Sequence, residues 1–352
     1  MPNSQENSAR SNGVIFGGAV GIAVCLVLVF WPYQKSVSGE TDIITVEFSA
    51  DGKKLLGGTR GGEAYLWNLG TGQMPGSGYK LKSSNEDVPS SFNALALAPK
   101  GEFVLSTGAK LSLINTGSAK DPPMIWAPDC AFGGAAVSPD GSHISSMSSE
   151  ERLLVWTLGI SDKPRDLGRA DAGVYGATAF SPDGRRIASA GHILRMVDVE
   201  SGGRLWARPR DNYVFLTVAF RPDGKTIATG SQDTSIRLWN AETGEEIAIL
   251  RGHQAYVDAI AFSPDGEKIV SWARDGQLFL WDLSLAKTRH RFLGKTKGGA
   301  AFSPNGRWVA SGGPSKLVQL WDASNGEKAG EFSADARSMH TTGGSTDKKH
   351  EK

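Results

Sequence analysis

The stretch Arg251–Leu283, RGHQAYVDAIAFSPDGEKIVSWARDGQLFLWDL, contains the most regular copy of a phrase that occurs seven times in this chain. The phrase is an apolar residue followed by a short turn that closes on glycine. Its copies are FSADG at Phe48–Gly52, LAPKG at Leu97–Gly101, VSPDG at Val137–Gly141, FSPDG at Phe180–Gly184, FRPDG at Phe220–Gly224, FSPDG at Phe262–Gly266 and FSPNG at Phe302–Gly306. Successive closing glycines lie 49, 40, 43, 40, 42 and 40 residues apart, and this period indicates a repeat architecture.

The residues around each turn predict a four-stranded unit. Proline sets φ for a tight turn, and Asp-Gly or Asn-Gly supplies the reversing positions. Short β-type runs such as Lys268–Ser271 follow, and a third run alternates apolar residues such as Ile236 and Leu238. Each third run ends on tryptophan or an apolar substitute, at Trp67, Ile114, Trp156, Val197, Trp239, Trp281 and Trp321. A glycine-containing turn then leads into a fourth strand.

Four strands per repeat of about 40 residues correspond to one blade of a β-propeller. A single blade cannot bury both of its faces, so the units must stack around an axis. The sequence therefore predicts an all-β, seven-bladed propeller over residues 41–334. Counting strands from Ile43, each blade can supply its own four, and we expect the ring to close without a strand borrowed from the N-terminus.

Arg251–Leu283 resembles a WD repeat almost throughout, and the resemblance to the WD-repeat β-propeller family covers Thr41–Ala334. In that family a buried tetrad joins a histidine, a serine or threonine, an aspartate and a tryptophan by hydrogen bonds. The resemblance places this tetrad at His253, Ser271, Asp275 and Trp281. A buried polar network that is fully satisfied locks the blade that contains it.

The other blades depart from this pattern, which implies that the blades differ in stability. The fifth has Thr229 and Asp233 at the expected positions but Asp211 where histidine is expected. The seventh has Ser315 in place of the aspartate, and the second lacks both the aspartate and the tryptophan. We therefore expect the second blade to be the weakest.

An apolar segment near the N-terminus predicts a single membrane span at residues 13–33, after a disordered N-terminus at 1–12. No charged residue occurs between Ser11 and Gln34, and Val14–Trp31 (VIFGGAVGIAVCLVLVFW) is nearly all apolar. Roughly 20 helical residues cross a hydrocarbon core of about 30 Å. A cleaved signal peptide is the alternative. It should have a hydrophobic region of about 7–15 residues and a small-x-small cleavage site, and this run is longer and ends in bulky side chains.

The charges that flank this segment do not fix its orientation. Arg10 precedes the span and Lys35 follows it, so the positive-inside comparison is close to a tie. We expect the common arrangement, in which the short N-terminus is cytoplasmic and the propeller lies on the non-cytoplasmic side of the membrane. The linker of about ten residues reaches at most about 35 Å, which keeps the propeller near the bilayer. The polar tail at 335–352 is expected to be disordered.

Composition and side-chain spacing predict no catalytic, metal or cofactor site. The formal net charge is +1, so no overall field favours nucleic acid. Outside the apolar segment, which includes Cys25, the single thiol at Cys130 cannot form an internal disulfide. The histidines show no metal-ligand spacing. The glycine-rich Gly57–Gly62 lacks the strand–loop–helix setting of a phosphate site and is interpreted as a hairpin turn.

The expected function is a non-catalytic scaffold that binds other proteins or peptides. In the WD-repeat family the loops before the first strand and between the second and third strands hold partners. The resemblance carries these rim positions to Tyr256, Asp258 and Arg274 in blade six, Leu216 and Gln232 in blade five, and Arg60 in blade one. Tyrosine and arginine often anchor interfaces, because each offers a large contact area with a polar end.

One alternative comes from Val197–Trp206, VDVESGGRLW, which resembles the docking phrase of quinoprotein-type propellers. That family includes cofactor-dependent enzymes and non-enzymatic envelope assembly scaffolds. Catalysis in the central channel would need ionisable residues on the innermost strands. The predicted innermost strands contain mainly alanine, glycine, valine and threonine, so the sequence favours a protein that is not an enzyme.

Overall fold

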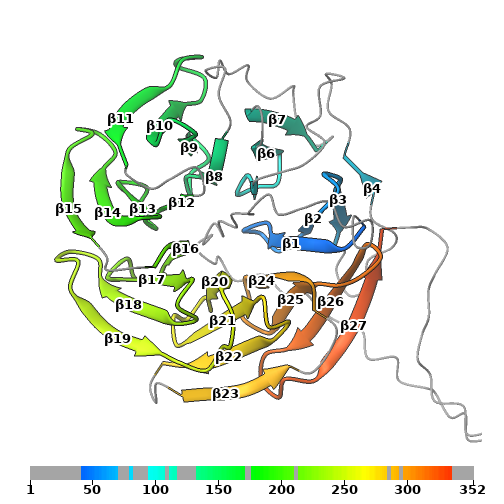
Figure 1. Ribbon diagram of the computed structural model, residues 1–352. Helices are drawn as coiled ribbons and strands as arrows, with labels where there is room; N and C mark the ends of the chain where they lie inside the picture. The colour runs from blue at the N-terminus through cyan, green and yellow to red at the C-terminus, as the bar shows by residue number, and fades with distance from the viewer. Residues whose placement is uncertain are drawn as a thin grey trace, which may run out of the picture.

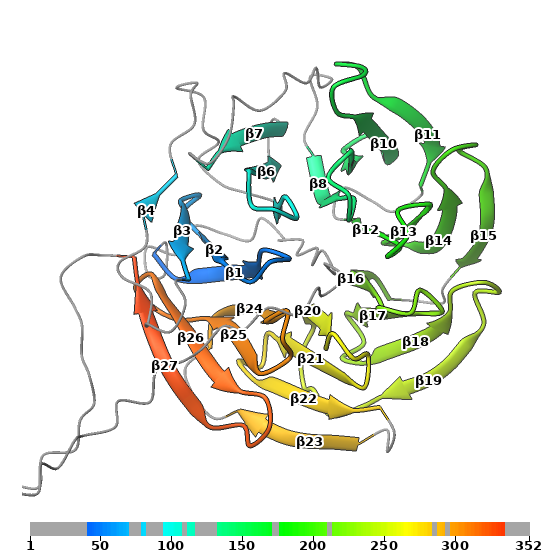
Figure 2. The same cartoon turned by 180° about the vertical axis from the view of Figure 1, so that it is seen from behind.

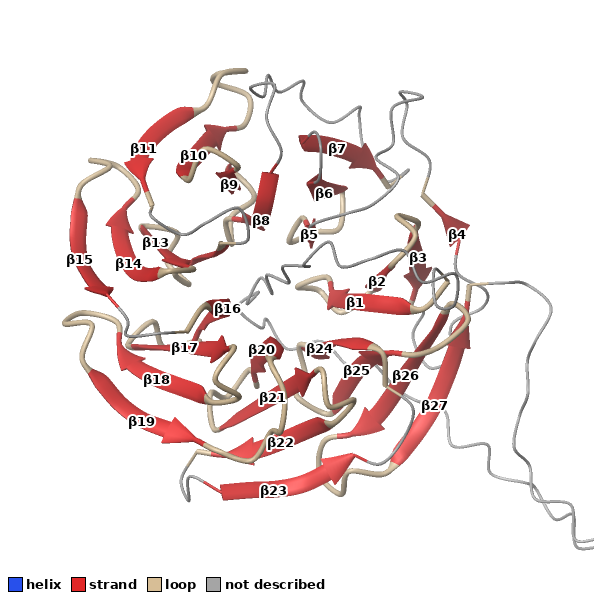
Figure 3. Ribbon diagram, viewed as in Figure 1, coloured by secondary structure: helices blue, strands red, loops and turns tan. Residues whose placement is uncertain are grey.

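The computed structural model describes residues 41–69, 79–81, 94–107, 111–116, 132–170, 176–209, 213–283, 287–292 and 296–334. Every regular element in these ranges is a β-strand (Figure 3). The strands form seven antiparallel sheets arranged radially around one axis (Figure 1). The predicted all-β propeller with seven blades is confirmed.

The blades follow one another in chain order. Blade 1 consists of β1 (Ile43–Phe48), β2 (Lys54–Thr59), β3 (Ala64–Asn68) and β4 (Tyr79–Lys80). The described strands of blade 2 are β5 (Ala94–Leu97), β6 (Phe103–Thr107) and β7 (Leu111–Asn115). Blade 3 consists of β8 (Phe132–Val137), β9 (His143–Ser148), β10 (Arg152–Thr157) and β11 (Arg165–Arg169). Blade 4 consists of β12 (Ala177–Phe180), β13 (Arg186–Ala190), β14 (Ile193–Asp198) and β15 (Arg204–Pro209).

The remaining three blades are complete in the described residues. Blade 5 consists of β16 (Phe215–Phe220), β17 (Thr226–Ser231), β18 (Ile236–Asn240) and β19 (Glu246–Leu250). Blade 6 consists of β20 (Val257–Phe262), β21 (Lys268–Ala273), β22 (Leu278–Asp282) and β23 (Lys287–Phe292). Blade 7 consists of β24 (Gly298–Phe302), β25 (Trp308–Gly312), β26 (Leu317–Asp322) and β27 (Lys328–Ser333).

The first strand of each blade lies nearest the axis, and the last described strand lies on the perimeter (Figures 1 and 2). The turns from first to second and from third to fourth strand share one face of the ring, called the lower face below. The turns from second to third strand, and the loops that precede each first strand, share the opposite upper face. Each sheet uses only consecutive strands, so the predicted closure without a borrowed strand is confirmed.

Hydrogen bonds within the recurring phrase explain its sequence. In blade 6 the Gly266 N–H donates to the Ser263 carbonyl at 2.8 Å, and glycine takes the positive φ of 72° that other residues avoid. The Ser263 hydroxyl donates to the Asp265 carboxylate and accepts the Lys268 N–H at 2.9 Å. The same serine bridge occurs at Ser49, Ser138, Ser181 and Ser303. In these five blades the phrase therefore closes the hairpin and satisfies its backbone groups, while at Ala98 and Arg221 the glycine N–H closes the turn without the serine.

The hydrophobic core lies between the blades. The next-to-last residues of the third strands are all buried, namely Trp67, Ile114, Trp156, Val197, Trp239, Trp281 and Trp321. One cluster combines Ile43 and Trp67 of blade 1 with Trp308 and Phe332 of blade 7. Burial of apolar surface between neighbouring blades is therefore what holds the ring together.

The predicted docking phrase links blade 4 to blade 5. Trp206 on β15 donates its Nε1–H to the Ala241 carbonyl at 3.0 Å. A Cβ atom on Gly244 would lie 2.7 Å from the Trp206 indole, so the ring packs directly on this turn. Arg208 adds a hydrogen bond to the Gly244 carbonyl at 2.9 Å. The phrase therefore has a packing role that needs no cofactor.

Direct backbone contact closes the ring between blades 7 and 1. The Ile43 N–H donates to the Gly313 carbonyl at 2.9 Å. A Cβ atom on Gly312 would lie 2.0 Å from the Ile43 carbonyl oxygen, and one on Gly298 would lie 2.4 Å from that of Ile44. Only glycine allows two backbones to approach this closely.

Several predicted segments fall outside the described residues: the N-terminus at 1–12, the membrane span at 13–33 and the tail at 335–352. The expected fourth strand of blade 2 and Cys130 fall outside them too. Within the described ranges, no helix has the length and apolar character needed to span a membrane.

The closure contact predicts that Gly312→Ala destabilises the propeller by about 2 kcal/mol or more, because its methyl group meets backbone that cannot rotate away. Gly203→Ala is the matched control, since its Cβ would meet only the rotatable Ser201 hydroxyl at 3.2 Å. Urea unfolding of both variants measures the difference. Equal stability of the two variants would contradict the closure account.

Candidate interaction surface

Blade 6 contains a continuous chain of buried hydrogen bonds beneath its upper face. His253 Nε2 lies 2.7 Å from Ser271 Oγ, and His253 Nδ1 lies 3.1 Å from Asp275 Oδ2. Trp281 donates its Nε1–H to Ser271 Oγ at 2.7 Å. The four side chains that the family resemblance placed together are therefore in contact.

The chemistry of the four groups fixes the positions of their protons. Tryptophan can only donate, so the Ser271 hydroxyl accepts from Trp281; if the imidazole is neutral and carries its proton on Nδ1, the hydroxyl donates its own proton to His253 Nε2. An ionised carboxylate can only accept, so His253 Nδ1–H donates to Asp275. Asp275 also accepts the Gln254 N–H at 2.8 Å, which ties the loop before β20 to the turn after β21. Every step of the chain is satisfied with a neutral imidazole.

Burial favours the same neutral form of His253. The side chain is enclosed, and its ring lies 4.5 Å from that of Phe279. Burial lowers the pKa of His253 below its ordinary value of 6.5, although Asp275 acts in the opposite direction. The network is therefore a structural lock on the blade.

A β-bulge at the start of β20 shapes the rim of blade 6. Val257 pairs with Ala273 and Ala259 pairs with Trp272, so Asp258 is the extra residue between them. The bulge brings Asp258 beside Arg274, which follows β21. Arg274 Nε donates to Asp258 Oδ2 at 2.6 Å and Nη2 donates to Oδ1 at 3.2 Å.

Three of the predicted rim residues form one surface cluster, which we call the Tyr256 cluster: Tyr256, Asp258 and Arg274. Tyr256 is 41 % exposed, and the Arg274 guanidinium lies 5.1 Å from the centre of its ring. Asp258 is 6 % exposed. The bidentate pair holds the guanidinium in one orientation, so the exposed part of the cluster is preorganised.

The electrostatics of Asp258 connect blade 6 with blade 1. Burial raises the pKa of the Asp258 carboxyl, while the positive charges of Arg274 and Arg60 favour its ionised form. Arg60 is an exposed rim residue of blade 1, and its charge reaches Asp258 across the upper face. The predicted positions on blades 1 and 6 therefore belong to one surface.

The predicted rim position Leu216 needs correction. Leu216 is the bulge residue of β16, the position that Asp258 occupies in blade 6. It is only 3 % exposed, about as buried as Asp258 at the equivalent position, and its apolar side chain has no group that could orient a rim residue as Asp258 orients Arg274. It offers no exposed side chain to a partner. Gln232, the second predicted position in blade 5, is partly exposed.

Blade 5 contains a different buried lock, which the sequence pattern did not reveal. Asp233 accepts a hydrogen bond from Arg237 Nη2 at 2.6 Å, and the guanidinium lies 4.3 Å from the centre of the Tyr213 ring. Burial alone would raise the pKa of Asp233, but hydrogen bonds from Arg237 and Ser235 lower it to about 2. Asp211, where the family has histidine, lies outside the described residues. The sequence signal for this lock is Arg237, two positions before Trp239. Blade 6 has Phe279 at the equivalent position.

Blades 7 and 1 share charged groups on the upper face that the sequence analysis also missed. Asp42 accepts the Ser315 N–H at 3.2 Å and lies 3.3 Å from Lys297 Nζ. It thereby supplies from blade 1 the carboxylate that the blade 7 turn lacks. Lys316 Nζ lies 3.3 Å from Glu63 of blade 1. These contacts link the two blades beside the glycine closure.

The described residues contain no group of three or more His, Cys, Asp or Glu side chains that could hold a metal ion. The innermost strands present mainly small and apolar residues, as in FLTVAF at Phe215–Phe220 and GGAAF at Gly298–Phe302. The features that the described upper face does offer are charged and aromatic side chains on a rigid support.

Comparison with known proteins identifies the repeats. Residues 210–240, 244–282 and 289–322 match the WD40 family, described as WD domain, G-beta repeat. These segments fall on blades 5, 6 and 7. The chain is thus a seven-bladed propeller that contains WD40 repeats.

Individual relatives match parts of the chain. WD repeat-containing protein 82 of Drosophila melanogaster is 28% identical over 127 residues, which cover 34% of this chain and 40% of the relative. Protein tipD of Dictyostelium discoideum is 29% identical over 235 residues, covering 62% of this chain and 36% of the relative. The matches thus span less than half of either relative. The crystal structure of the computationally designed Ika8 protein, 20% identical, has a TM-score of 0.62 and covers 84% of this chain and 88% of its own, which supports the fold.

The blade 6 network predicts that Ser271→Ala costs about 2–4 kcal/mol of folding stability, because it leaves both Trp281 Nε1 and His253 Nε2 without this partner. Thr229→Val in blade 5 is the comparison, since Thr229 Oγ1 accepts the Trp239 Nε1–H at 2.9 Å and its loss costs only about 1–2 kcal/mol. Urea unfolding measures both. A larger loss for Thr229→Val would show that the hydrogen bond between Ser271 and His253 adds nothing to folding stability.

The lowered pKa of His253 predicts a pH dependence of stability. Below about pH 6.5 the unfolded chain binds a proton on this histidine, while the folded protein resists it. The unfolding free energy should therefore be fully retained well above pH 6.5 and fall as the pH drops below about 6.5, until the folded protein also binds the proton. His253→Gln should show a shallower fall over this range when unfolding is followed at several pH values. Identical slopes for the two proteins would refute the assignment.

Proposed function

We propose that this propeller is a protein-interaction scaffold and that partners bind its upper face at blades 5, 6 and 1. Propellers with WD repeats generally bind other proteins and are generally not catalysts, and no enzymatic role is indicated for this chain. The observation that carries the proposal is the Tyr256 cluster, an exposed aromatic ring held by a bidentate arginine–aspartate pair.

The chemistry of the cluster suits a binding anchor. Interface energy concentrates on a few tyrosine, tryptophan and arginine residues that become fully desolvated. Tyr256 offers an exposed ring, and Arg274 is already oriented by Asp258, so little side-chain freedom is lost on binding. Arg60 adds a positive charge nearby, which favours a partner segment that presents a carboxylate together with an apolar side chain.

We also propose that the scaffold is tethered to a membrane through residues 13–33, with the propeller on the non-cytoplasmic side. Support comes from the uncharged run between Ser11 and Gln34, which is long enough to cross a bilayer. A linker of about ten residues would keep the first strand of the propeller within about 35 Å of the membrane. Binding partners would then be other proteins of the same envelope or surface.

The quinoprotein-like alternative has a specific observation behind it, the docking of Trp206 on blade 5. That contact is between an indole and a backbone turn, and the Arg208 guanidinium beside it donates to the carbonyls of the same turn. The contact therefore supports a way of packing blades together that resembles that of quinoprotein-type propellers, and it gives no support to cofactor chemistry. An assembly scaffold within the envelope agrees with the contact and with the proposed function.

Site-specific photocrosslinking tests the upper face. With p-benzoylphenylalanine in place of Tyr256 in the full-length protein, irradiation of cells should give a discrete adduct with a partner protein. Arg60→Glu and Arg274→Ala in the same background should reduce the adduct about tenfold, since each removes part of the anchor.

Ile160 supplies the matched control, because it is 83 % exposed on the lower face. The photoreactive residue at 160 should give no such adduct. An adduct that forms equally at both positions, or that survives both arginine changes, would refute upper-face binding.

Membrane tethering is tested by extraction and protease treatment. The full chain should remain in the membrane pellet after alkaline carbonate washing, and a chain that lacks residues 1–35 should not. Protease added to intact cells or spheroplasts should remove a C-terminal tag from the full chain. A tag that survives until the membrane is opened would place the propeller in the cytoplasm.

A further inference from the structure

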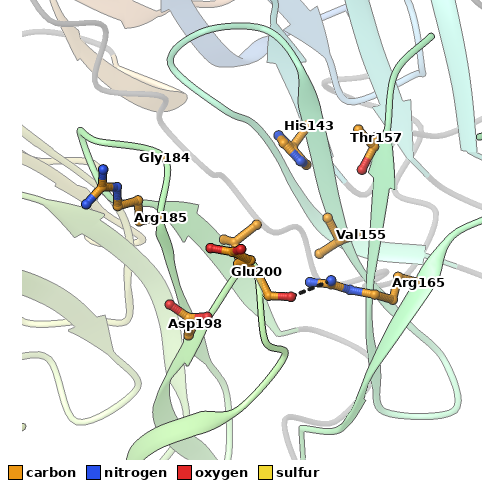
Figure 4. A pocket seen from close by; sticks show the side chains of 9 residues that line it. His143, Val155, Thr157, Arg165, Gly184, Arg185, Asp198 and Glu200 are labelled. Atoms are coloured by element: carbon orange, nitrogen blue, oxygen red, sulfur yellow. Dashed lines mark hydrogen bonds between the residues drawn. The ribbon is translucent and has the colours of Figure 1, made fainter. Parts of the chain in front are cut away.

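A cleft of about 670 Å³ lies on the lower face between blades 3 and 4, away from the Tyr256 cluster (Figure 4). His143 of β9 and Arg165 of β11 lie on the blade 3 side. Gly184, in the turn between β12 and β13, and Asp198 and Glu200, at the end of β14, lie on the blade 4 side. Two equivalent places between other blades have a long basic side chain where blade 3 has His143.

Between blades 4 and 5 a long basic side chain crosses the equivalent gap. Arg186 is the second residue after its closing glycine, the same position that His143 has in blade 3. Arg186 Nη2 donates to the Gly224 carbonyl of blade 5 at 3.0 Å, and Nη1 lies 3.4 Å from Glu242 Oε2. A guanidinium thus binds a turn carbonyl and a carboxylate of the next blade.

Between blades 1 and 2 a lysine makes a similar crossing. Lys54, also two residues after its closing glycine, donates from Nζ to the Gly101 carbonyl at 2.7 Å and lies 3.2 Å from Thr116 Oγ1. Burial lowers the pKa of Lys54, while Asp51 and Glu102 act to raise it. The same position therefore carries a crossing cation in two separate blade pairs.

Blade 3 has the short imidazole of His143 at this position, and the contact that crosses to blade 4 comes from Arg165, which donates to the Glu200 carbonyl. His143 Nδ1 instead lies 2.7 Å from the hydroxyl of its neighbour Ser142. The groups that would receive a cation are still present in blade 4. Gly184 and Glu200 occupy the sequence positions of Gly224 and Glu242 and line the cleft.

The charged side chains that line the cleft are two carboxylates, Asp198 and Glu200, and two guanidinium groups, Arg165 and Arg185. Asp198 supplies a second carboxylate, whose Oδ1 accepts the Ser201 N–H at 2.7 Å. Arg165 Nη1 donates to the Glu200 carbonyl at 2.7 Å and so braces one wall. Figure 4 shows the Arg185 guanidinium directed away from His143. Two carboxylates and a turn carbonyl therefore remain as acceptors around the space.

We propose that this cleft binds the guanidinium group of an arginine side chain from a partner protein. The incoming group occupies the place that Arg186 fills between blades 4 and 5 and donates to the Gly184 carbonyl and to Glu200. A planar guanidinium can donate to two acceptors at once, which a lysine ammonium does less specifically. This lower-face site is independent of binding at the Tyr256 cluster.

Histidine NMR of the full-length protein tests the site directly. The chain has 6 histidines, so ¹³Cε1 labelling gives few signals, and the one from His143 is identified by its loss in His143→Gln. Titration with N-acetyl-arginine-methylamide should shift the His143 signal saturably. N-acetyl-norleucine-methylamide, of similar length without the charge, should not shift it. Glu200→Gln should weaken the apparent affinity for the arginine probe about two- to fivefold.

A stability measurement gives an independent test. His143→Arg should place an internal guanidinium in the cleft and raise the midpoint of thermal unfolding by about 1–3 °C. In the double variant that combines His143→Arg with Glu200→Gln, this gain in the unfolding midpoint should be lost. The proposal is overturned if the norleucine probe shifts His143 as the arginine probe does, or if inorganic phosphate shifts it and the arginine probe does not. An unshifted signal at saturating arginine probe, or no stability gain in His143→Arg, also overturns it.

Discussion

The contact on which the rest of the structure depends is the backbone-to-backbone approach of blade 7 to blade 1. Each blade is built from its own consecutive strands, so no shared strand ties the ends of the chain together. Gly298 and Gly312 let β24 and β25 lie against Ile43 and Ile44 with no side chain between them. Asp42 and Lys316 reinforce the junction on the upper face. If this junction opens, the two faces lose their fixed geometry.

Within this closed ring, neighbouring blades solve the same packing problem with different chemistry. Blade 6 uses a neutral histidine between Ser271 and Asp275, whereas blade 5 uses an ion pair between Asp233 and Arg237. Either arrangement satisfies its buried polar groups, which is what a blade requires. The rims of the two blades also differ, because the bulge residue Asp258 of blade 6 orients Arg274 while the equivalent Leu216 of blade 5 has no polar group to do so. Local departures from the repeat therefore place an exposed tyrosine and an oriented arginine on the blade 6 part of the upper face.

The sequence was sufficient to predict the repeat number and the strands of most blades, and the family resemblance supplied the blade 6 hydrogen-bond partners. These features depend on local spacing, as in the turn from Ser263 to Gly266. Contacts between blades were harder to predict from the sequence, because they join residues far apart in the chain. Nothing near Ser315 indicates that Asp42 caps its turn, and nothing in β16 indicates that Leu216 packs inward. The cleft beside His143 was also hidden, since it is visible only when Arg186 and its partners in the next blade are compared in space.

Hydrogen exchange of the full-length protein, followed by mass spectrometry, tests the central claim of a ring closed by direct contact. The account predicts that peptides covering β1, β24 and β25 exchange as slowly as those covering β16 and β20, because all these strands open only when the whole propeller unfolds. Rapid exchange of β1, with protection retained in β16 and β20, would show that blades 7 and 1 separate on their own. That result would contradict the closed ring and the rigid upper face built on it.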